Sequence, residues 1–288
     1  MSSIIVTGGS GFLATEFVRS FKKKNIYLIS RKKLKKNKNF KNIVCDLTNK
    51  SKTINIIQKI NPKEIYHFAW SGIPIFNKKN LMVNKTISKN LIAGLNKTNC
   101  KKIIISGTGA EYGDIKKVCY EYSKPSKKIS ELGRQKNLIR KLFFEKLNKD
   151  IVVVWARIFY VYGKNQRDGS LLNELIKAKK NKRYIHLKKP FLSNDFIYIK
   201  DVISGILKLK KIKKSKIINI SSSKSTSNLT FVKTFEKVNN ISLVKKSQEK
   251  KFKNTKFGFN RRLKNLGWKQ KYNLEKGLSE VCRQLNKQ

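Results

Sequence analysis

The chain has 288 residues, of which 67 are Lys or Arg and 17 are Asp or Glu, giving a formal net charge of +50 at pH 7. This length suits one large domain, or one domain with a small second lobe. Its apolar stretches are too short to cross a membrane, and its four cysteines and two histidines lack the spacing of a metal site, so we expect no metal and a reduced, cytoplasmic compartment.

The basic residues occur in short runs throughout the chain and form neither a tail nor a single stripe. Abundant Asn and Ile accompany them, which indicates a compositional bias that fills surface positions with lysine. We therefore interpret the charge as a solvated basic surface and expect no specific binding of nucleic acid. A functional basic face for an anionic ligand, a membrane surface or RNA is the alternative.

Short apolar runs alternate with longer amphipathic stretches over the first 160 residues. The runs predict strands at 3–7, 26–30, 42–45, 64–69, 102–107 and 151–156. The stretches predict helices near 11–24, 51–60, 80–98 and 130–147. Such alternation is typical of a parallel sheet with helices on both faces, so the predicted fold is α/β, of the doubly wound Rossmann type.

The regular alternation of predicted strands and helices ends at about residue 160. The later segments predict helices near 170–180, 201–210, 228–239 and 274–286, with short strands at 184–187, 195–199 and 216–220. This part is less regular, and we expect it to build a small C-terminal substrate-binding lobe. The predicted division is a cofactor-binding domain at 1–160 and the lobe at 161–288, interleaved with that domain.

The first predicted strand runs into a glycine-rich turn, Gly8-x-x-Gly11-x-x-Ala14, that opens the first predicted helix. Gly8 permits a tight turn, Gly11 lets the backbone approach a pyrophosphate, and Ala14 lets the helix pack closely on the strand. The N–H groups at the start of such a helix favour an anion. With a strand before it and a helix after it, the turn predicts a dinucleotide site rather than an ordinary strand-to-helix connection.

The ends of the next strands carry further candidates for that site. The second strand ends at Ser30 and Arg31, where an acidic residue would suit the ribose hydroxyls of NAD and a basic one suits the extra phosphate of NADP. Arg31 therefore favours NADP, with NAD as the alternative. Asp46 ends the third strand and can accept a hydrogen bond from the adenine amino group. His67, in the fourth, is expected to be a structural histidine of the core.

Further matches follow in order along nearly the whole chain. They comprise Asp46, Leu47, His67, Phe68, Ala69, Asn84 and the segments 106–113, 157–163, 195–202 and 266–268. Together with the turn at 7–14, this series resembles the extended short-chain dehydrogenases/reductases, in the NAD-dependent epimerase/dehydratase branch that acts on nucleotide sugars. By that resemblance, the cofactor-binding residues are Gly8, Ser10, Gly11, Phe12, Leu13, Arg31, Asp46, Leu47, Phe68, Ala69, Trp70, Ser106 and Lys136.

The chemistry of this family uses a Ser or Thr, a Tyr and a Lys, with the last two spaced Tyr-x-x-x-Lys. The resemblance implies that Thr108 binds the reacting sugar oxygen and that Lys136 orients the cofactor. Ser130 and Gly133 match the same block without a gap, which places Leu132 where the family has its tyrosine.

Leucine cannot carry a proton, and three explanations stay open. The match of this segment to the family pattern is out of register, or another acid takes the place of the tyrosine, or the protein has lost the redox step and only binds its ligands. The candidate substitutes near in sequence are Tyr112, Glu111, Tyr120 and Tyr122.

Gly109 and Ala110 follow Thr108 where the dehydratases of this family carry an Asp-Glu pair, which disfavours a dehydratase. The resemblance then implies an NAD(P)-dependent nucleotide-sugar reductase or epimerase, acting on a keto-sugar nucleotide in surface polysaccharide synthesis. The alternative is a catalytically impaired member that binds NAD(P) or a sugar nucleotide. Family members often dimerise through the helices that correspond to 80–98 and 130–147, so a homodimer is expected.

Four arginines are candidates for the pyrophosphate of the substrate, because a guanidinium group offers two parallel donors to phosphate. They are Arg167, Arg183, Arg261 and Arg262.

Overall fold

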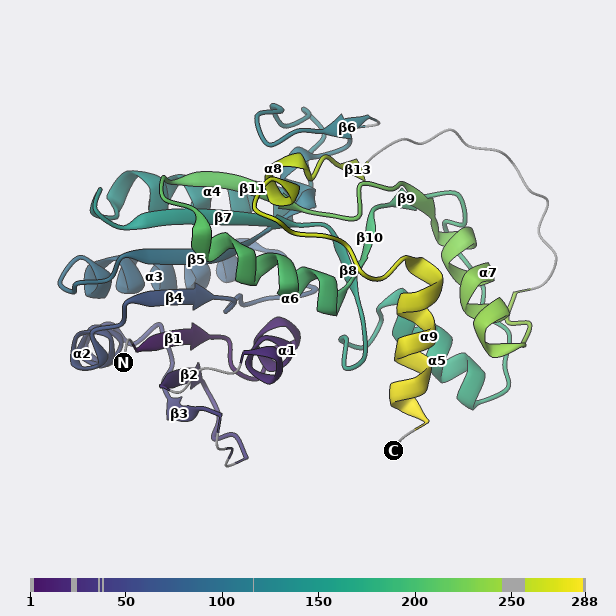
Figure 1. Ribbon diagram of the computed structural model, residues 1–288, viewed down its shortest axis with the longest axis horizontal. Helices are drawn as coiled ribbons and strands as arrows, with labels where there is room; N and C mark the ends of the chain where they lie inside the picture. Colours follow the sequence, from purple (N-terminus) through teal and green to yellow (C-terminus); the bar gives the residue numbers. More distant parts are fainter. Residues whose placement is uncertain are drawn as a thin grey trace. The chain divides into compact units, whose positions relative to one another are not determined.

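The computed structural model describes residues 3–21, 25–35, 37, 39–115, 117–244 and 257–286 (Figure 1). The chain forms two compact units. The first comprises Met1–Asp114, Pro125–Arg157 and Ile206–Ile218, and the second comprises Ile115–Lys124, Ile158–Gly205 and Asn219–Gln288. Three separate stretches of chain thus contribute to each unit.

A seven-stranded sheet has the order β11-β7-β5-β4-β1-β2-β3. Its strands are β1 (Ile4–Thr7), β2 (Ile26–Ser30), β3 (Lys41–Val44), β4 (Glu64–His67), β5 (Lys102–Thr108), β7 (Val152–Ile158) and β11 (Lys216–Ile220). The pairs from β5 through β4, β1 and β2 to β3 are parallel. The strand order reverses between β1 and β4, so the predicted doubly wound α/β fold is confirmed.

Helices cover both faces of this sheet in the first unit. They are α1 (Phe12–Ser20), α2 (Lys50–Ile60), α3 (Lys78–Leu95) and α4 (Glu131–Lys146). Ile57, Leu91 and Phe143, from α2, α3 and α4, belong to one buried cluster with alternate residues of the strands. On the other face, Phe17 of α1 packs against Tyr66 with ring centroids 4.4 Å apart. The two faces are visible in Figure 1, where α1 lies in front of the sheet and α3 and α4 lie behind it.

Local side chains explain where these helices begin and end. Asn49, Asn77 and Ser130 each accept a hydrogen bond from a backbone N–H in the first turn of α2, α3 and α4. Asn61 ends α2 in the left-handed region, with φ of 45°. α1 ends at Ser20, earlier than the expected end at 24, and positions 22–24 of that prediction lie outside the described residues.

The second unit contains short strand pairs and four helices among its described residues. Parallel pairs join β8 (Tyr160–Tyr162) to β10 (Phe196–Tyr198) and β6 (Val118–Cys119) to β13 (Phe257–Gly258), and an antiparallel pair joins β9 (Ser193–Asn194) to β12 (Thr226–Ser227). The helices are α5 (Leu171–Lys180), α7 (Asn228–Asn239), α8 (Arg261–Lys264) and α9 (Leu274–Leu285). Another helix, α6 (Ile199–Lys208), continues into the 3₁₀ helix η2 (Leu209–Lys211).

The predicted strand at 184–187 is wrong. These residues form no strand, and the Ile185 N–H makes one isolated hydrogen bond of 2.7 Å to the carbonyl oxygen of Leu243. A single bond does not make a ladder, and Tyr184 beside it is exposed.

Two buried aspartates organise the interior of the second unit. Asp201 accepts the N–H groups of Lys271 and Tyr272 at 2.9 Å each, and its own carbonyl accepts the indole N–H of Trp268 at 3.2 Å. Asp195 accepts the N–H groups of Ser222 and two other residues. Both carboxylates therefore hold loops together, which gives the segment 195–202 a structural task. In the described ranges, no helix combines the length and hydropathy needed to cross a bilayer.

Candidate active site

The glycine-rich turn after β1 is built so that only glycine fits at its first position. Gly8 has φ of 76°, and a Cβ added there would lie 2.8 Å from the backbone nitrogen of Ala69 and 2.9 Å from its Cα. The Gly11 N–H closes the turn on the Gly8 carbonyl at 2.8 Å. The ends of β1 and β4 therefore approach each other closely at this point.

The N-terminus of α1 follows directly. Gly11 is its N-cap residue, makes no side-chain cap, and is followed by a first turn without acidic residues. Ser10 and Gly11 are exposed, Phe12 and Leu13 are half-buried, and Ala14 is fully buried behind them. This helix end presents N–H groups that no side chain caps, so it can accept an anion.

Arg31 and Asp46 lie at the ends of neighbouring strands and are both exposed. Hydrogen bonds from the Thr48 N–H and hydroxyl, at 2.9 and 2.8 Å, lower the pKa of Asp46, and the charge of Arg31 adds to this effect. Asp46 is therefore an ionised acceptor. The Ser30 hydroxyl is engaged by other residues of the protein, because it donates to the Lys32 carbonyl at 2.6 Å and accepts from the Asn42 side-chain amide at 2.9 Å.

His67 has a structural role at the end of β4. The Thr7 hydroxyl accepts the Ala69 N–H at 3.2 Å and shares a hydrogen bond of 2.7 Å with His67 Nδ1. Burial lowers the pKa of His67 to about 3, and the charge of Lys136 adds to this lowering. The imidazole is neutral and tied to β1, with Phe68 buried and Ala69 half-buried after it.

Lys136 of α4 reaches the end of β5. Its Nζ donates to the Ser106 carbonyl at 2.6 Å and lies 3.7 Å from the centre of the Trp70 ring. The residue is only 6% exposed, and burial lowers the pKa of Lys136 to about 7 against the opposing effect of Glu111. Trp70 Nε1 is buried and has no hydrogen-bond partner among the described residues. An unpaired buried donor thus lies beside the ammonium group.

Thr108 begins a short 3₁₀ helix, η1 (Gly109–Tyr112), as part of a capping box. Its hydroxyl accepts the Ala110 N–H at 3.2 Å, and its own N–H donates to Glu111 Oε1 at 2.8 Å. Glu111 Oε1 also accepts the indole N–H of Trp155 at 2.8 Å, and Oε2 accepts Arg157 Nε at 2.9 Å. This fully buried carboxylate fixes the backbone at Thr108, a role that the sequence analysis missed.

Leu132 lies one helical turn before Lys136 and shares its face of α4. The positions around it have structural reasons. The Ser130 hydroxyl accepts the Gly133 N–H at 3.2 Å, and a Cβ at Gly133 would collide with the Ala110 carbonyl. Leu132 is half-buried and brings no proton-carrying group to this face.

The candidate substitutes for the missing tyrosine are placed as follows. Glu111 is engaged by three donors, and Tyr112 is fully buried with the Arg157 guanidinium 4.3 Å from its ring centre. Tyr120 and Tyr122 belong to the second unit, where their rings stack at 5.2 Å. Glu111 and Tyr112 are thus engaged within the first unit, and a substitute acid for the missing tyrosine stays a prediction.

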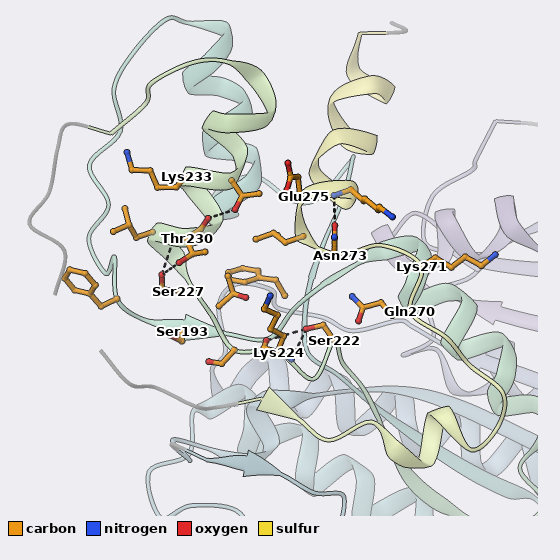
Figure 2. A pocket seen from close by; sticks show the side chains of 18 residues that line it. Ser193, Ser222, Lys224, Ser227, Thr230, Lys233, Gln270, Lys271, Asn273 and Glu275 are labelled. Carbon is orange, nitrogen blue, oxygen red and sulfur yellow. Dashed lines mark hydrogen bonds between the residues drawn. The ribbon is translucent and has the colours of Figure 1, made fainter. Parts of the chain in front are cut away.

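A pocket of ≈ 950 Å³ lies in the second unit, beside the first turns of α7 and α9 (Figure 2). Ser227 and Asn273 cap these helices by accepting N–H groups of Thr230 and Lys276, so both helix ends are satisfied by their own side chains. Of the lining residues, Figure 2 labels Ser193, Ser222, Lys224, Ser227, Thr230, Lys233, Gln270, Lys271, Asn273 and Glu275.

The four arginines considered for a pyrophosphate are not among the residues that line this pocket. Arg183 pairs with Glu174 at 3.5 Å, and Arg262 with Glu121 at 3.8 Å. Arg167 and Arg261 are exposed. The structure therefore does not bring the four together around this pocket.

The fold and the first turn define a class: doubly wound α/β proteins with a glycine-rich connection between the first strand and the first helix. Residues 4–221 match the model of the NAD dependent epimerase/dehydratase family. The chain belongs to this family, as the motif series predicted.

Curated relatives and solved structures agree with this assignment. UDP-glucuronic acid decarboxylase 6 of Arabidopsis thaliana is 27% identical, over 96% of this chain and 86% of its own length. The UDP-glucose 4-epimerase of Thermotoga maritima, solved with UDP-glucose, has a TM-score of 0.84 at 21% identity and 99% coverage of both chains. The UDP-glucuronic acid 4-epimerase of Bacillus cereus, solved with UDP-glucuronic acid and NAD, has a TM-score of 0.81 at 23% identity, covering 98% of this chain and 99% of its own.

Proposed function

We propose that the protein is an NAD(P)-dependent enzyme that acts on a nucleotide sugar, as an epimerase or a reductase. The observation that carries this proposal is the position of Lys136, which is buried at the C-terminal end of β5 and bonded to the Ser106 carbonyl. Ligands of doubly wound folds bind at these strand ends. The names of the relatives support a nucleotide-sugar substrate.

The residues at this edge fit a dinucleotide. Gly8 lets the end of β1 approach the Ala69 backbone closely, α1 offers N–H groups that no side chain caps, and Trp70 Nε1 lacks a partner among the described residues. The binding set we propose is Gly8, Ser10, Gly11, Phe12, Leu13, Arg31, Asp46, Leu47, Phe68, Ala69, Trp70, Ser106 and Lys136. When bound, the nicotinamide ring accepts or returns a hydride.

The side chains of the protein position the sugar. The Thr108 hydroxyl accepts the Ala110 N–H, so its own proton is available to donate to the reacting sugar oxygen. Lys136 uses one of its N–H groups on Ser106, which leaves others for the ribose hydroxyls of the cofactor. We propose that Arg31, exposed at the end of β2, binds the extra phosphate of NADP.

The reaction we favour is epimerisation or reduction of a keto-sugar nucleotide in surface polysaccharide synthesis. By the resemblance, the dehydratases of this family carry an Asp-Glu pair directly after the Thr, and Gly109 and Ala110 stand there instead.

Calorimetry with NAD, NADP, UDP-glucose and UDP-glucuronic acid tests the proposal, and reduction of the bound cofactor by a nucleotide sugar tests its chemistry. We expect one dinucleotide to bind, and Gly8→Ala to abolish that binding. A folded protein that binds neither dinucleotide would refute the proposed function.

A binding-only role is the second candidate, and Leu132 favours it because leucine carries no proton. Leu132→Tyr separates the two roles. A nucleotide-sugar reductase activity that appears only in this variant would indicate a lost catalyst, whereas turnover in the parent would indicate another proton carrier.

We propose that α3 and α4 form the interface of a homodimer. Met82 on α3 and Leu138 on α4 are 53% and 54% exposed, so these two adjacent helices offer apolar side chains to a second copy of the chain. Leu138→Lys is expected to give a monomer in sedimentation velocity, while Tyr184→Lys, at another exposed apolar position, leaves the dimer intact. A monomeric parent protein would refute this proposal.

A further inference from the structure

We propose that Lys136 is itself the proton carrier of the reaction, in the role that the family gives to the tyrosine replaced by Leu132. This inference rests on the proposed function and deepens it. It assigns to one side chain both the contact with the cofactor and the transfer of the proton.

The surroundings of Lys136 are unusual for a lysine in a chain with so many exposed ones. It is 6% exposed, and within the described ranges it forms no ion pair with a carboxylate. Its Nζ has one hydrogen bond, to the neutral Ser106 carbonyl, and two aromatic neighbours, with ring centres of Trp70 at 3.7 Å and Trp155 at 6.0 Å. Carbonyl and aromatic partners stabilise an ammonium group less than a carboxylate does, so the amine form is accessible.

The titratable groups that face Lys136 come from two elements. His67 on β4 is neutral and bonded to Thr7, so it neither attracts nor repels strongly as an ion. Glu111 on η1 favours the ammonium form, but its oxygens are engaged by Trp155 and Arg157. Burial outweighs the effect of Glu111 and brings the pKa of Lys136 to about 7, where an amine can both take and return a proton.

Position supports the same role. Ser106 and Thr108 are two residues apart on β5, so their side chains lie on the same face of the strand. Lys136 bonds the Ser106 carbonyl, two residues before Thr108, so it contacts the same strand end from which Thr108 would bind the sugar oxygen. Leu132, one turn away on the same face of α4, carries no acid that would compete with the amine for the proton.

The proposed step balances as follows. In the oxidising direction the O–H bond of a sugar hydroxyl breaks and its proton forms an N–H bond on the Lys136 amine, directly or through one water. The oxygen forms a double bond to its carbon as the hydrogen on that carbon leaves, with its electron pair, to the oxidised nicotinamide cofactor of the proposed function. In the return direction the Lys136 ammonium gives the proton back to oxygen.

The first test does not depend on activity. Protein labelled with ¹³C at the lysine ε-carbon is titrated by NMR, and the Lys136 resonance is identified by its absence in Lys136→Met. We expect a midpoint near pH 7 for this resonance, well below the value of about 10.4 that is typical of a lysine side chain in a model peptide. A Lys136 midpoint in the range of the exposed lysines would overturn the proposal.

The second test separates proton transfer from cofactor orientation. Lys136→Arg keeps a cation with several donors but cannot lose its proton. We expect it to bind the dinucleotide while the rate of cofactor reduction by nucleotide sugar falls by about 10²-fold or more. We expect Leu132→Tyr in the Lys136→Arg background to restore much of that rate, since a phenol then lies one turn away. Lys141→Arg is the matched control and leaves the rate unchanged.

The outcomes distinguish a failure of the role of Lys136 from a failure of the proposed function on which that role rests. Retention of turnover in Lys136→Arg refutes the role of Lys136 and leaves the nucleotide-sugar enzyme in place. Absence of dinucleotide binding in the parent protein refutes the proposed function, and this inference fails with it. In the parent, a rate that rises with pH around 7 supports the inference, and a rate insensitive to pH between 6 and 9 contradicts it.

Discussion

The carboxylate of Glu111 offers the sharpest test of how the structure supports Thr108. Glu111→Gln keeps the shape of the side chain and removes its charge. If the remaining oxygen faces Thr108 and Trp155, the new amide group points its hydrogens at Arg157 Nε, which is also a donor. If the amide is turned, two hydrogen bonds are lost instead. No orientation of glutamine satisfies all three donors.

The cost follows from burial. The Glu111 and Arg157 side chains are 0% and 3% exposed, so the variant leaves a guanidinium group without its counter-charge in a region closed to water. Breaking such a buried pair costs about 3–5 kcal/mol. That is a large part of the total stability of a typical protein, which is about 5–15 kcal/mol.

Urea unfolding followed by tryptophan fluorescence measures this cost, because Trp155 lies within the network. The matched control is Glu131→Gln on α4, whose partner Arg134 is exposed and whose loss is expected to cost about 0.5 kcal/mol or less. Glu111→Gln should also weaken the binding of nucleotide sugar, since either orientation of the glutamine disturbs the network that holds the backbone at Thr108. A loss of stability equal to that of Glu131→Gln would refute the idea that Glu111 organises this region.

Three further predictions concern the cofactor edge. Gly8→Ala and Gly169→Ala both force alanine into a positive φ, of 76° and 72°, but only the Cβ at position 8 would meet backbone, at 2.8 Å. In urea unfolding, Gly8→Ala should therefore lower the free energy of unfolding by about 1–3 kcal/mol more than Gly169→Ala does. Equal losses of stability would contradict the close approach of β1 and β4. Arg31→Ala should raise the Kd for NADP about tenfold in calorimetry and leave that for NAD unchanged, with Arg19→Ala as the exposed control; equal effects on both cofactors would remove the basis for a preference for NADP. Between its folded pKa of about 7 and an unfolded pKa of about 10.4, Lys136 binds fewer protons in the folded state than in the unfolded state. The free energy of unfolding should therefore rise with pH across that window, by up to about 1.4 kcal/mol per pH unit relative to Lys136→Met. Parallel stability profiles of the parent and Lys136→Met would show that the folded pKa of Lys136 is not lowered.

The sequence predicted the elements whose pattern is local. The strand, turn and helix at the start of the chain follow from an apolar run, spaced glycines and a helical repeat, and β1 and α1 confirm them. The amphipathic stretches predicted helix starts near 51, 80 and 130, close to the observed starts at Lys50, Lys78 and Glu131. The residue-level assignments of the cofactor site stay predictions until binding is measured.

The remaining features depend on contacts between distant residues. Strands of two residues, such as β9 and β12, have no periodicity to recognise and exist because their partners approach them. Glu111 stands in a glycine-rich segment that gives no sign of Trp155 and Arg157, more than 40 residues later. The one hint is Arg157 itself, a charged residue inside the apolar run 152–158, since a buried cation needs a partner from elsewhere in the fold.

Lys136 also bears on the choice between an enzyme and a binding-only protein. A buried lysine without a carboxylate partner disfavours the folded state below its unfolded pKa, and an apolar residue such as methionine would remove that cost. Ser130 and Gly133 have structural contacts that would persist in a protein with no chemistry, so their presence does not discriminate. Lys136 discriminates only together with turnover, because a buried amine can serve ligand binding in either kind of protein, whereas proton transfer belongs to the enzyme alone. If Lys136→Met is more stable than the parent near neutral pH yet loses turnover, the side chain is retained for function at the expense of stability. If the variant is less stable, Lys136 serves the fold, and the binding-only role gains support.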